Sequence, residues 1–150
     1  MILAFRLGGR LIAACGVAAE SFAFHDSRYL GRRKDHAALL PTYFRRLLEQ
    51  TTPKAIYAYA PSAADSSTEE LLTLLETTAA TFGLPVKRLA RSDLFTAFGL
   101  QPFRTRSELL ASLLHLWPEL ATNHVPRQLP LAEAAATALV GDLRERWPPV

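Results

Sequence analysis

The sequence predicts an α/β fold in which helices flank a mixed five-stranded sheet, formed as one domain over residues 1–150. The chain has 150 residues, of which 49% are hydrophobic, and this supplies enough apolar surface for one core. Its first 30 residues contain three short runs separated by turns, which is typical of an antiparallel meander. Helical and strand patterns then alternate, which favours parallel strands joined by right-handed crossovers.

Three strands are expected in the first part of the chain. Residues 2–5 are apolar and a Gly-Gly turn follows them. Residues 11–19 are rich in small side chains, so another element can pack closely on this strand. Residues 21–25 alternate with period two, which predicts that Phe22 and Phe24 lie on one face of the sheet.

The remaining elements follow from helical spacing, caps and breakers. Apolar residues recur every three or four positions in each long helix, and proline or glycine ends most segments. We expect the order βββαβαβαα. The two later strands cover 55–60 and 85–89, and a loop covers 123–130. The helices cover 37–50 (with Pro41 in the first turn), 66–82, 92–98 (a short helix), 106–116 and 131–146 (the closing helix).

Composition excludes several classes of protein. The net charge is only +3 and the apolar content is high, which excludes intrinsic disorder. Cys15 is the single cysteine, so a disulfide scaffold and a four-cysteine zinc site are excluded, and we expect a buried free thiol. Arg6 and Arg10 interrupt the N-terminal apolar stretch, which argues against a signal peptide. We therefore expect a cytoplasmic protein with no membrane partner and no small-molecule substrate.

Four short stretches carry a resemblance that spans nearly the whole chain. Residues 2–11 read Ile-Leu-Ala-Phe-Arg-Leu-Gly-Gly-Arg-Leu, and residues 53–59 read Pro-Lys-Ala-Ile-Tyr-Ala-Tyr. Residues 83–86 read Gly-Leu-Pro-Val, and residues 130–139 read Pro-Leu-Ala-Glu-Ala-Ala-Ala-Thr-Ala-Leu. In this order they resemble the RuvC-type Holliday junction resolvases, which have the ribonuclease H-like fold. That family begins Ile-Leu-Gly-Ile-Asp-Pro-Gly-x-Arg-Val, so the glycine and the arginine match without a gap.

The resemblance also implies the position of an active site. Enzymes of this fold cleave phosphodiesters with divalent metal ions held by clustered carboxylates. The resemblance places four carboxylates where this chain has Arg6, Tyr59, Pro130 and Glu133. One carboxylate cannot offset two cations, and Arg6 repels them. We therefore expect no catalytic residues, no metal, no cofactor and no two-metal cleavage; an active nuclease needs a carboxylate cluster elsewhere, and the sequence offers none.

Arg6 and Glu133 are expected to interact. If the guanidinium of Arg6 occupies the space of a metal ion, it forms charge-assisted hydrogen bonds with the carboxylate of Glu133. The alternative is that Arg6 points to solvent and that Glu133 is an ordinary acidic residue in the first turn of a helix. A separation well beyond about 4 Å between the two groups would exclude the ion pair.

The charge pattern makes DNA or RNA the expected partner. Basic segments at 28–46 and 87–106 are separated by an acidic segment at 49–76, so the folded surface is polarised. Structured or branched DNA is the class that the resemblance implies. The alternative is an ordinary solvated basic surface. The candidate residues for binding phosphates are Arg6, Arg10, Arg32, Arg33, Lys34, Arg104 and Arg106.

A second hypothesis is a protein-interaction or scaffold domain that has no nucleic-acid role. The helix over 66–82 carries more leucine than one buried face needs, and excess apolar residues on a helix often mark an interface. Relatives of the resembled type dimerise through this helix. A homodimer is therefore expected, with an interface formed by Leu71, Leu72, Leu74 and Leu75.

Overall fold

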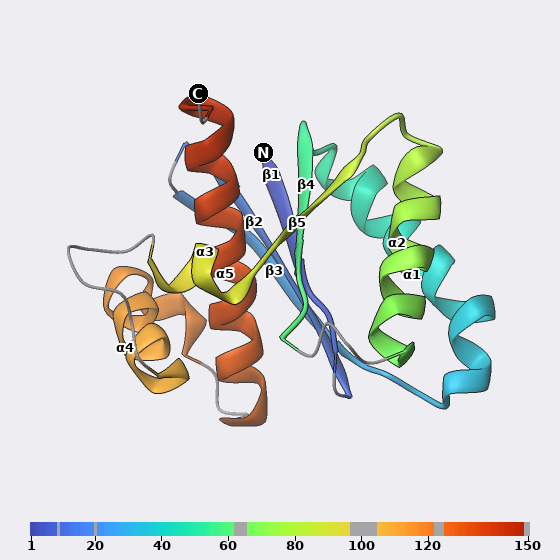
Figure 1. The fold of residues 1–150 in the computed structure, drawn as a ribbon, viewed down its shortest axis with the longest axis horizontal. Helices are drawn as coiled ribbons and strands as arrows, with labels where there is room; N and C mark the ends of the chain where they lie inside the picture. Colours follow the sequence, from blue (N-terminus) through green and yellow to red (C-terminus); the bar gives the residue numbers. More distant parts are fainter. Residues whose placement is uncertain (9, 20, 62–65, 97–104, 122–124, 149–150) are drawn as a thin grey trace.

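The computed structural model describes residues 1–8, 10–19, 21–61, 66–96, 105–121 and 125–148 (Figure 1). One sheet of five strands has the order β3-β2-β1-β4-β5. The first three strands form the expected antiparallel meander, and β4 and β5 continue the sheet in parallel to β1. The α/β fold class is therefore confirmed. The strands are β1 (Ile2–Arg6), β2 (Leu11–Ala18), β3 (Ser21–Tyr29), β4 (Ala55–Tyr59) and β5 (Val86–Leu89).

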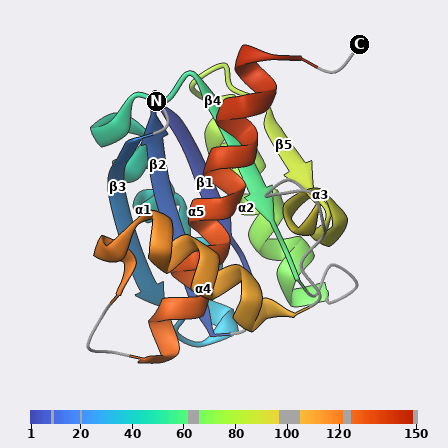
Figure 2. The same cartoon turned by 90° about the vertical axis from the view of Figure 1, so that its left-hand side faces the viewer.

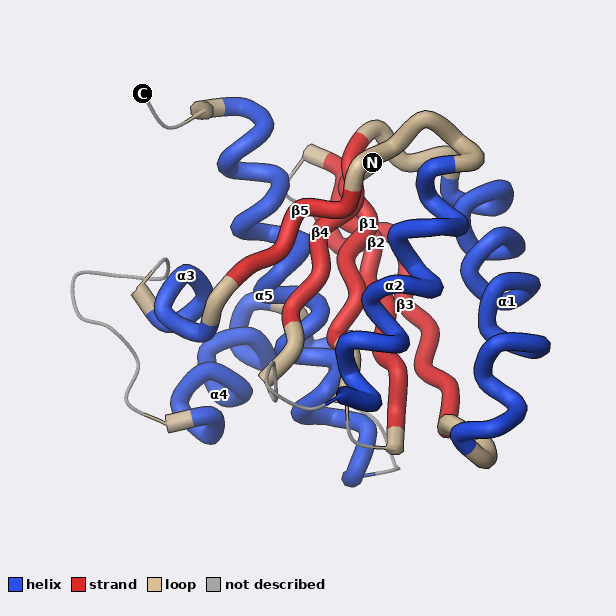
Figure 3. The backbone as a smooth tube through the Cα atoms, turned by 45° about the vertical axis from the view of Figure 1, so that its right-hand side comes forward, coloured by secondary structure: helices blue, strands red, loops and turns tan. Residues whose placement is uncertain are grey.

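Helices cover both faces of the sheet. Two of them, α1 (His36–Thr51) and α2 (Ser66–Ala80), lie on one face, as Figures 1 and 3 show. The opposite face is covered by α3 (Arg91–Phe95), α4 (Arg106–Leu116) and α5 (Val125–Arg146), and α5 lies directly on the strands (Figure 2). Two short 3-10 helices, η1 (Arg33–Asp35) and η2 (Pro118–Leu120), precede α1 and follow α4. None of the described helices is long and apolar enough to cross a bilayer.

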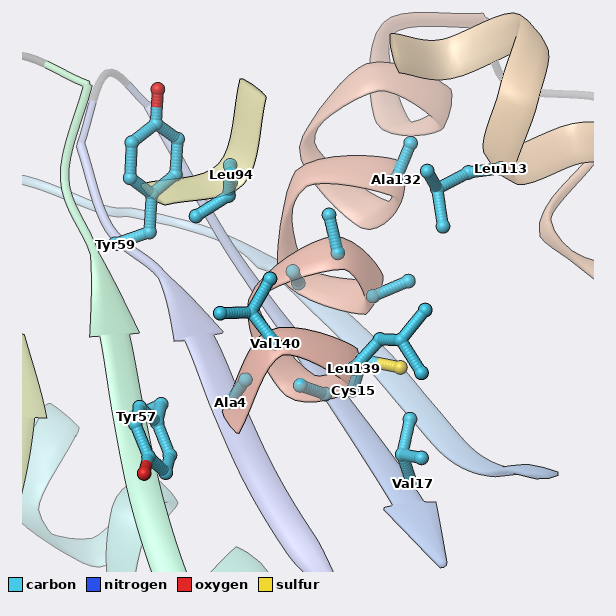
Figure 4. Close-up of a cluster of buried hydrophobic side chains, with 14 of the residues drawn as sticks. Ala4, Cys15, Val17, Tyr57, Tyr59, Leu94, Leu113, Ala132, Leu139 and Val140 are labelled. Atoms are coloured by element: carbon cyan, nitrogen blue, oxygen red, sulfur yellow. The ribbon is translucent and has the colours of Figure 1, made fainter. Parts of the chain in front are cut away.

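Alternation along the strands divides the core into two layers. Leu3, Phe5 and Ile12 face α1 and α2, whereas Ala4, Ala13 and Cys15 face α5. The α5 side is built from small residues on both partners, because fully buried alanines of α5 meet the alanines of β1 and β2 (Figure 4). The small side chains of the second strand therefore allow close helix packing, as expected. Cys15 is buried there, and its burial raises the pKa of the thiol.

The third strand differs from the alternation expected for it. Gly16 pairs with Phe24 and Val17 pairs with Phe22, which leaves Ala23 as an extra residue in a β-bulge. Phe22 consequently packs on the α5 side and Phe24 on the α1 and α2 side. The prediction that both rings share one face was wrong because a single inserted residue reverses the faces that follow it.

The positions of two prolines relative to the helix starts were predicted wrongly. Pro41 is the sixth residue of α1, in the second turn, where its missing N–H leaves the carbonyl of the exposed Ala37 to solvent. The closing helix begins at Val125, six residues earlier than expected, and it continues through the buried Pro130. The loop expected over 123–130 was wrong from residue 125 onward, because Pro130 packs in the core as the sixth residue of α5 and the helix continues through it.

Candidate nucleic-acid interface

The direction of the strands brings the expected site residues to one edge of the sheet. β1, β4 and β5 are parallel, and β3 runs the same way because each meander connection reverses the chain. The carboxyl ends of these four strands therefore lie together, and we call this edge the carboxyl edge. Arg6 ends β1, Tyr59 ends β4, and the two are register partners. The first turns of α5 bring Glu133 to the same edge.

Glu133 is held between two arginines. The carboxylate oxygen Oε1 lies 3.3 Å from Nε of Arg6 and accepts a hydrogen bond of 2.6 Å from Nη2 of Arg106. The Glu133 side chain is 0% exposed, whereas the side chains of Arg6 and Arg106 are 11% and 40% exposed. The structure thus contains the ion pair expected between Arg6 and Glu133 and adds Arg106 to it. We call these three residues the Arg6–Glu133–Arg106 cluster.

The charges of this cluster sum to one positive charge. Burial lowers the pKa of Arg6, the nearby Glu133 carboxylate opposes that shift, and an arginine side chain stays protonated in proteins. Arg6 also donates from Nη1 to the Gly8 carbonyl at 2.9 Å. Within the described residues, Nε of Arg6, Nε of Arg106 and Oε2 of Glu133 are buried without a hydrogen-bond partner. The net positive charge and the partly exposed guanidinium of Arg106 favour a ligand that carries negative charge and accepts hydrogen bonds.

Tyr59 and Pro130, at the other two positions where the resemblance implies carboxylates, add no carboxylate to the site. Burial raises the pKa of Tyr59, and the negative charge of Glu133 raises it further, so the phenol stays neutral near pH 7. Figure 4 shows its hydroxyl pointing away from the end of β4. Pro130 is buried in α5. One carboxylate engaged by two guanidinium groups does not fit a two-metal centre. Across the described ranges, no three His, Cys, Asp or Glu side chains gather as metal ligands.

The remaining basic candidates differ in their surroundings. Arg10 is exposed in the turn after β1, and its carbonyl accepts a 2.7 Å hydrogen bond from the N–H of Leu30. This hydrogen bond places the segment after β3 beside the turn. Arg32 and Lys34 are exposed in that segment, whereas Arg33 forms an ion pair with Glu70 of α2. Arg104 lies outside the described residues.

A pocket at the carboxyl edge brings in two arginines that sequence reasoning did not single out. It has a volume of about 480 Å³, lies between the ends of β4 and β5, and is lined in part by Tyr59, Arg88 and Arg91. Arg91 also contributes to the electrostatic field at the Tyr59 hydroxyl, together with Arg6 and Arg106. The basic segment 87–106 was the only sequence signal for these residues, and it could not show which side chains face Tyr59.

Most of the leucines expected at a dimer interface lie in the core. Leu71, Leu72 and Leu75 are 1%, 2% and 0% exposed and pack against the sheet and α1. Assigning these three to an interface was wrong, because α2 must cover both a sheet and a neighbouring helix. Leu74 is half-buried and lines a groove of about 590 Å³ between α1 and α2.

The comparisons with known proteins bear on the fold. No protein-family model matches the chain, and no curated protein sequence does. Thermus thermophilus RuvC superposes with a TM-score of 0.77 at 14% identity, covering 98% of this chain and 96% of that chain. The T. thermophilus RuvC in complex with a Holliday junction substrate gives the same TM-score and identity, covering 99% of this chain and 97% of that one. With these matches and the strand order above, the chain has a RuvC-like ribonuclease H fold.

Proposed function

We propose that residues 1–150 form a single domain that binds nucleic acid through the carboxyl edge and does not cleave it with metal ions. One observation carries the proposal: the buried carboxylate of Glu133 is held by the guanidinium groups of Arg6 and Arg106. In nucleases of this fold, metal ions supply the positive charge at this site. Here Arg6 and Arg106 supply it. Structured or branched DNA is the expected ligand.

Arginine suits this role because its planar fork presents several donors to phosphate oxygens. Arg106 is the most exposed member of the cluster, because 40% of its side chain is accessible to solvent. Arg10, Arg32 and Lys34 extend the positive charge along the same edge of the sheet. A phosphate backbone that crosses this edge would meet the cluster first and these exposed cations on either side.

A gel-shift titration tests the proposal with duplex, single-stranded and four-way-junction DNA. The four-way junction is included because T. thermophilus RuvC has been solved with a Holliday junction substrate. Binding should weaken steeply between about 50 and about 200 mM salt, since each phosphate that the protein binds releases counterions. Magnesium should neither strengthen binding nor produce cleavage. Cleavage that depends on magnesium, or no binding to any DNA, would overturn the proposal.

A matched pair of variants connects binding to the cluster. Arg106→Ala leaves Arg6 and Glu133 as a neutral pair, so affinity should fall by about tenfold, which equals about 1.4 kcal/mol. Arg45 is an exposed arginine of α1 and supplies the control. Arg45→Ala removes the same charge from the molecule and should leave the affinity nearly unchanged.

The second candidate function is a protein-interaction domain that works as a dimer. The groove between α1 and α2 supports it, because the half-buried Leu74 and the exposed Ala37 line this groove beside polar side chains. Size-exclusion chromatography with light scattering tests the oligomer. Leu74→Glu should convert a dimer to a monomer, while Leu116→Glu, at a 53% exposed position of α4, should not. A wild-type monomer would remove this candidate.

A further inference from the structure

The pocket at the ends of β4 and β5 lies where the chain changes faces. The chain leaves β4 for α2 and leaves β5 for α3, and these two helices lie on opposite sides of the sheet (Figure 3). Leu94 and Phe95 of α3 pack in the core layer on the α5 side. Neighbouring parallel strands whose connections leave toward opposite faces form a crevice beyond their carboxyl ends. In open α/β sheets this crevice is where ligands bind. We call it the β4–β5 pocket.

The walls of the β4–β5 pocket combine apolar and charged groups. Leu72, Leu89 and Pro61 contribute apolar surface, and the volume of about 480 Å³ is in the range of small-molecule sites. Glu69 lies at the rim and accepts two long hydrogen bonds from Nη1 of Arg88, at 3.3 and 3.4 Å. Its carboxylate can therefore still accept from the N–H or O–H groups of a ligand.

Arg91 supplies the positive end of the pocket. Its guanidinium lies 4.4 Å from the centre of the Phe95 ring, which leaves the N–H edges free, and it pairs with no carboxylate in the part of the chain that the structure describes. Arg88, by contrast, is paired with Glu69 and Glu76. Asp93 is engaged by the N–H of Ala90 and by Arg144. Arg91 is therefore the cation of this pocket that is available to an anion.

Tyr59 connects the pocket with the Arg6–Glu133–Arg106 cluster. It lines the β4–β5 pocket, and in the sheet it is the register partner of Arg6. Arg91, Arg106 and Arg6 all act on its hydroxyl. A phosphate held at the cluster is therefore next to the pocket, and the nucleotide attached to that phosphate can enter it.

We propose that the β4–β5 pocket binds one unpaired nucleotide of a nucleic-acid strand. The base lies against the apolar walls, Glu69 accepts from its N–H groups or from a sugar hydroxyl, and Arg91 binds a phosphate. A base inside a duplex cannot reach the pocket without leaving its stack. This inference rests on the proposed function and makes it narrower: the ligand is nucleic acid with an unpaired segment, in preference to an intact duplex.

Fluorescence anisotropy tests the pocket with three probes: a blunt duplex, the same duplex with a short 5′ overhang, and the same duplex with a short 3′ overhang. The wild-type protein should bind one of the overhang duplexes about tenfold more tightly than the blunt duplex. Ala90→Phe places a ring in the pocket from an exposed position, and it should abolish this preference without weakening blunt-duplex binding. Ala38→Phe, at an exposed position of α1, is the control.

Arg91→Ala provides a second route to the same answer if Ala90→Phe does not fold. It should lower affinity for the overhang duplex more than for the blunt duplex, and Arg45→Ala should change neither. Equal wild-type affinity for blunt and overhang duplexes would overturn the pocket inference and leave the proposed function standing. No wild-type affinity for any DNA would overturn both.

Calorimetric titration with a free nucleoside 5′-monophosphate shows whether the pocket binds a nucleotide that is part of a strand or a free nucleotide. Weak or undetectable binding, together with the preference for an overhang, supports a site for a nucleotide in a strand. Saturable binding that Ala90→Phe abolishes, without any preference for an overhang, would overturn that assignment and identify a free nucleotide as the ligand.

Discussion

Arg6 brings a positive charge to the end of β1 beside a carboxylate that is fully buried. Burying Glu133 alone would carry a large desolvation penalty, which is offset by the ion pair with Arg6 and by the charge-assisted hydrogen bond from Arg106. Because the two positive charges outnumber the single negative charge, the cluster attracts an anion. The same three side chains therefore account for the stability of the buried carboxylate and for the kind of ligand that the edge attracts.

Replacing Glu133 should destabilise the fold. In Glu133→Gln the two guanidinium groups face each other without the carboxylate between them, and the free energy of unfolding should fall by about 3 kcal/mol. Urea denaturation measures the change. Glu49→Gln, at an exposed position of α1, removes the same charge and should have almost no effect.

A double-mutant cycle separates the Arg6–Glu133 pair from simple packing. Arg6→Met keeps most of the volume of the side chain and removes its charge. In the double variant Arg6→Met/Glu133→Gln the buried charge of Arg6 is gone and only the partly exposed Arg106 lacks a carboxylate, so its unfolding free energy should exceed the value expected from adding the two single effects. Strictly additive effects would contradict a direct interaction between the two residues.

Asp93 gives stability a dependence on pH. A hydrogen bond from the N–H of Ala90 lowers the pKa of Asp93, burial opposes that shift, and Arg144 lowers the pKa further. Because the folded-state pKa is below the unfolded value of about 3.9, this stabilisation is present above pH 4 and is lost as the pH falls through the folded-state pKa. Asp93→Asn should therefore reduce stability near pH 7, and the difference from wild type should shrink as the pH falls below about 4.

The size of the Asp93 effect is limited by solvent. The side chains of Asp93 and Arg144 are 31% and 39% exposed, so screening keeps the expected difference below about 1 kcal/mol. Thermal denaturation of wild type and Asp93→Asn across the pH range measures this stability difference. A difference that grows at low pH would show that Asp93 has the opposite shift.

At the scale of the element, the sequence predicted most strands and helices, because the periodicity of apolar residues and the proline and glycine residues that end segments are local signals. The Arg106–Leu116 helix agrees at both ends with its predicted range. Periodicity could not reveal the bulge at Ala23, because an unpaired residue is defined by the partner strand. The early start of α5 was missed for a related reason: the packing of Pro130 in the core outweighs the usual meaning of proline.

The close approach of α5 to the sheet yields a prediction for Gly141. A β-carbon added there would lie 2.5 Å from the Tyr57 ring, and that ring is also held by a hydrogen bond of 3.3 Å from its hydroxyl to Glu145. Gly141→Ala should therefore lower the free energy of unfolding by about 1–3 kcal/mol, although alanine favours helices. Gly31→Ala, where nothing lies within 4 Å, is the control. Increased stability in Gly141→Ala would show that α5 can move away from Tyr57.

At the scale of the molecule, the parallel direction of β1, β3, β4 and β5 gathers charges that are far apart in the sequence. The sequence predicted the basic segments and the pairing of Arg6 with Glu133, because the resemblance gave their register. It did not predict that Arg106 joins the same carboxylate or that Arg91 lies near Tyr59, since both depend on how α3 and α4 pack beside α5. Interactions of that kind are set by tertiary packing and leave no local pattern.

If DNA binds at the carboxyl edge, two sets of exposed cations should contribute differently to DNA binding. Arg10, Arg32 and Lys34 are exposed at the carboxyl edge, whereas Arg45, Arg46 and Lys54 are exposed farther along α1 and beyond it, toward the opposite edge. Replacing the first three by alanine should weaken DNA binding and reduce the slope of log affinity against log salt by about 0.9 for each phosphate that the variant no longer neutralises. Replacing the second three lowers the net charge equally and should leave the slope unchanged. Equal weakening of binding in the two triple variants would show that DNA responds to total charge alone and that the carboxyl edge is not the interface.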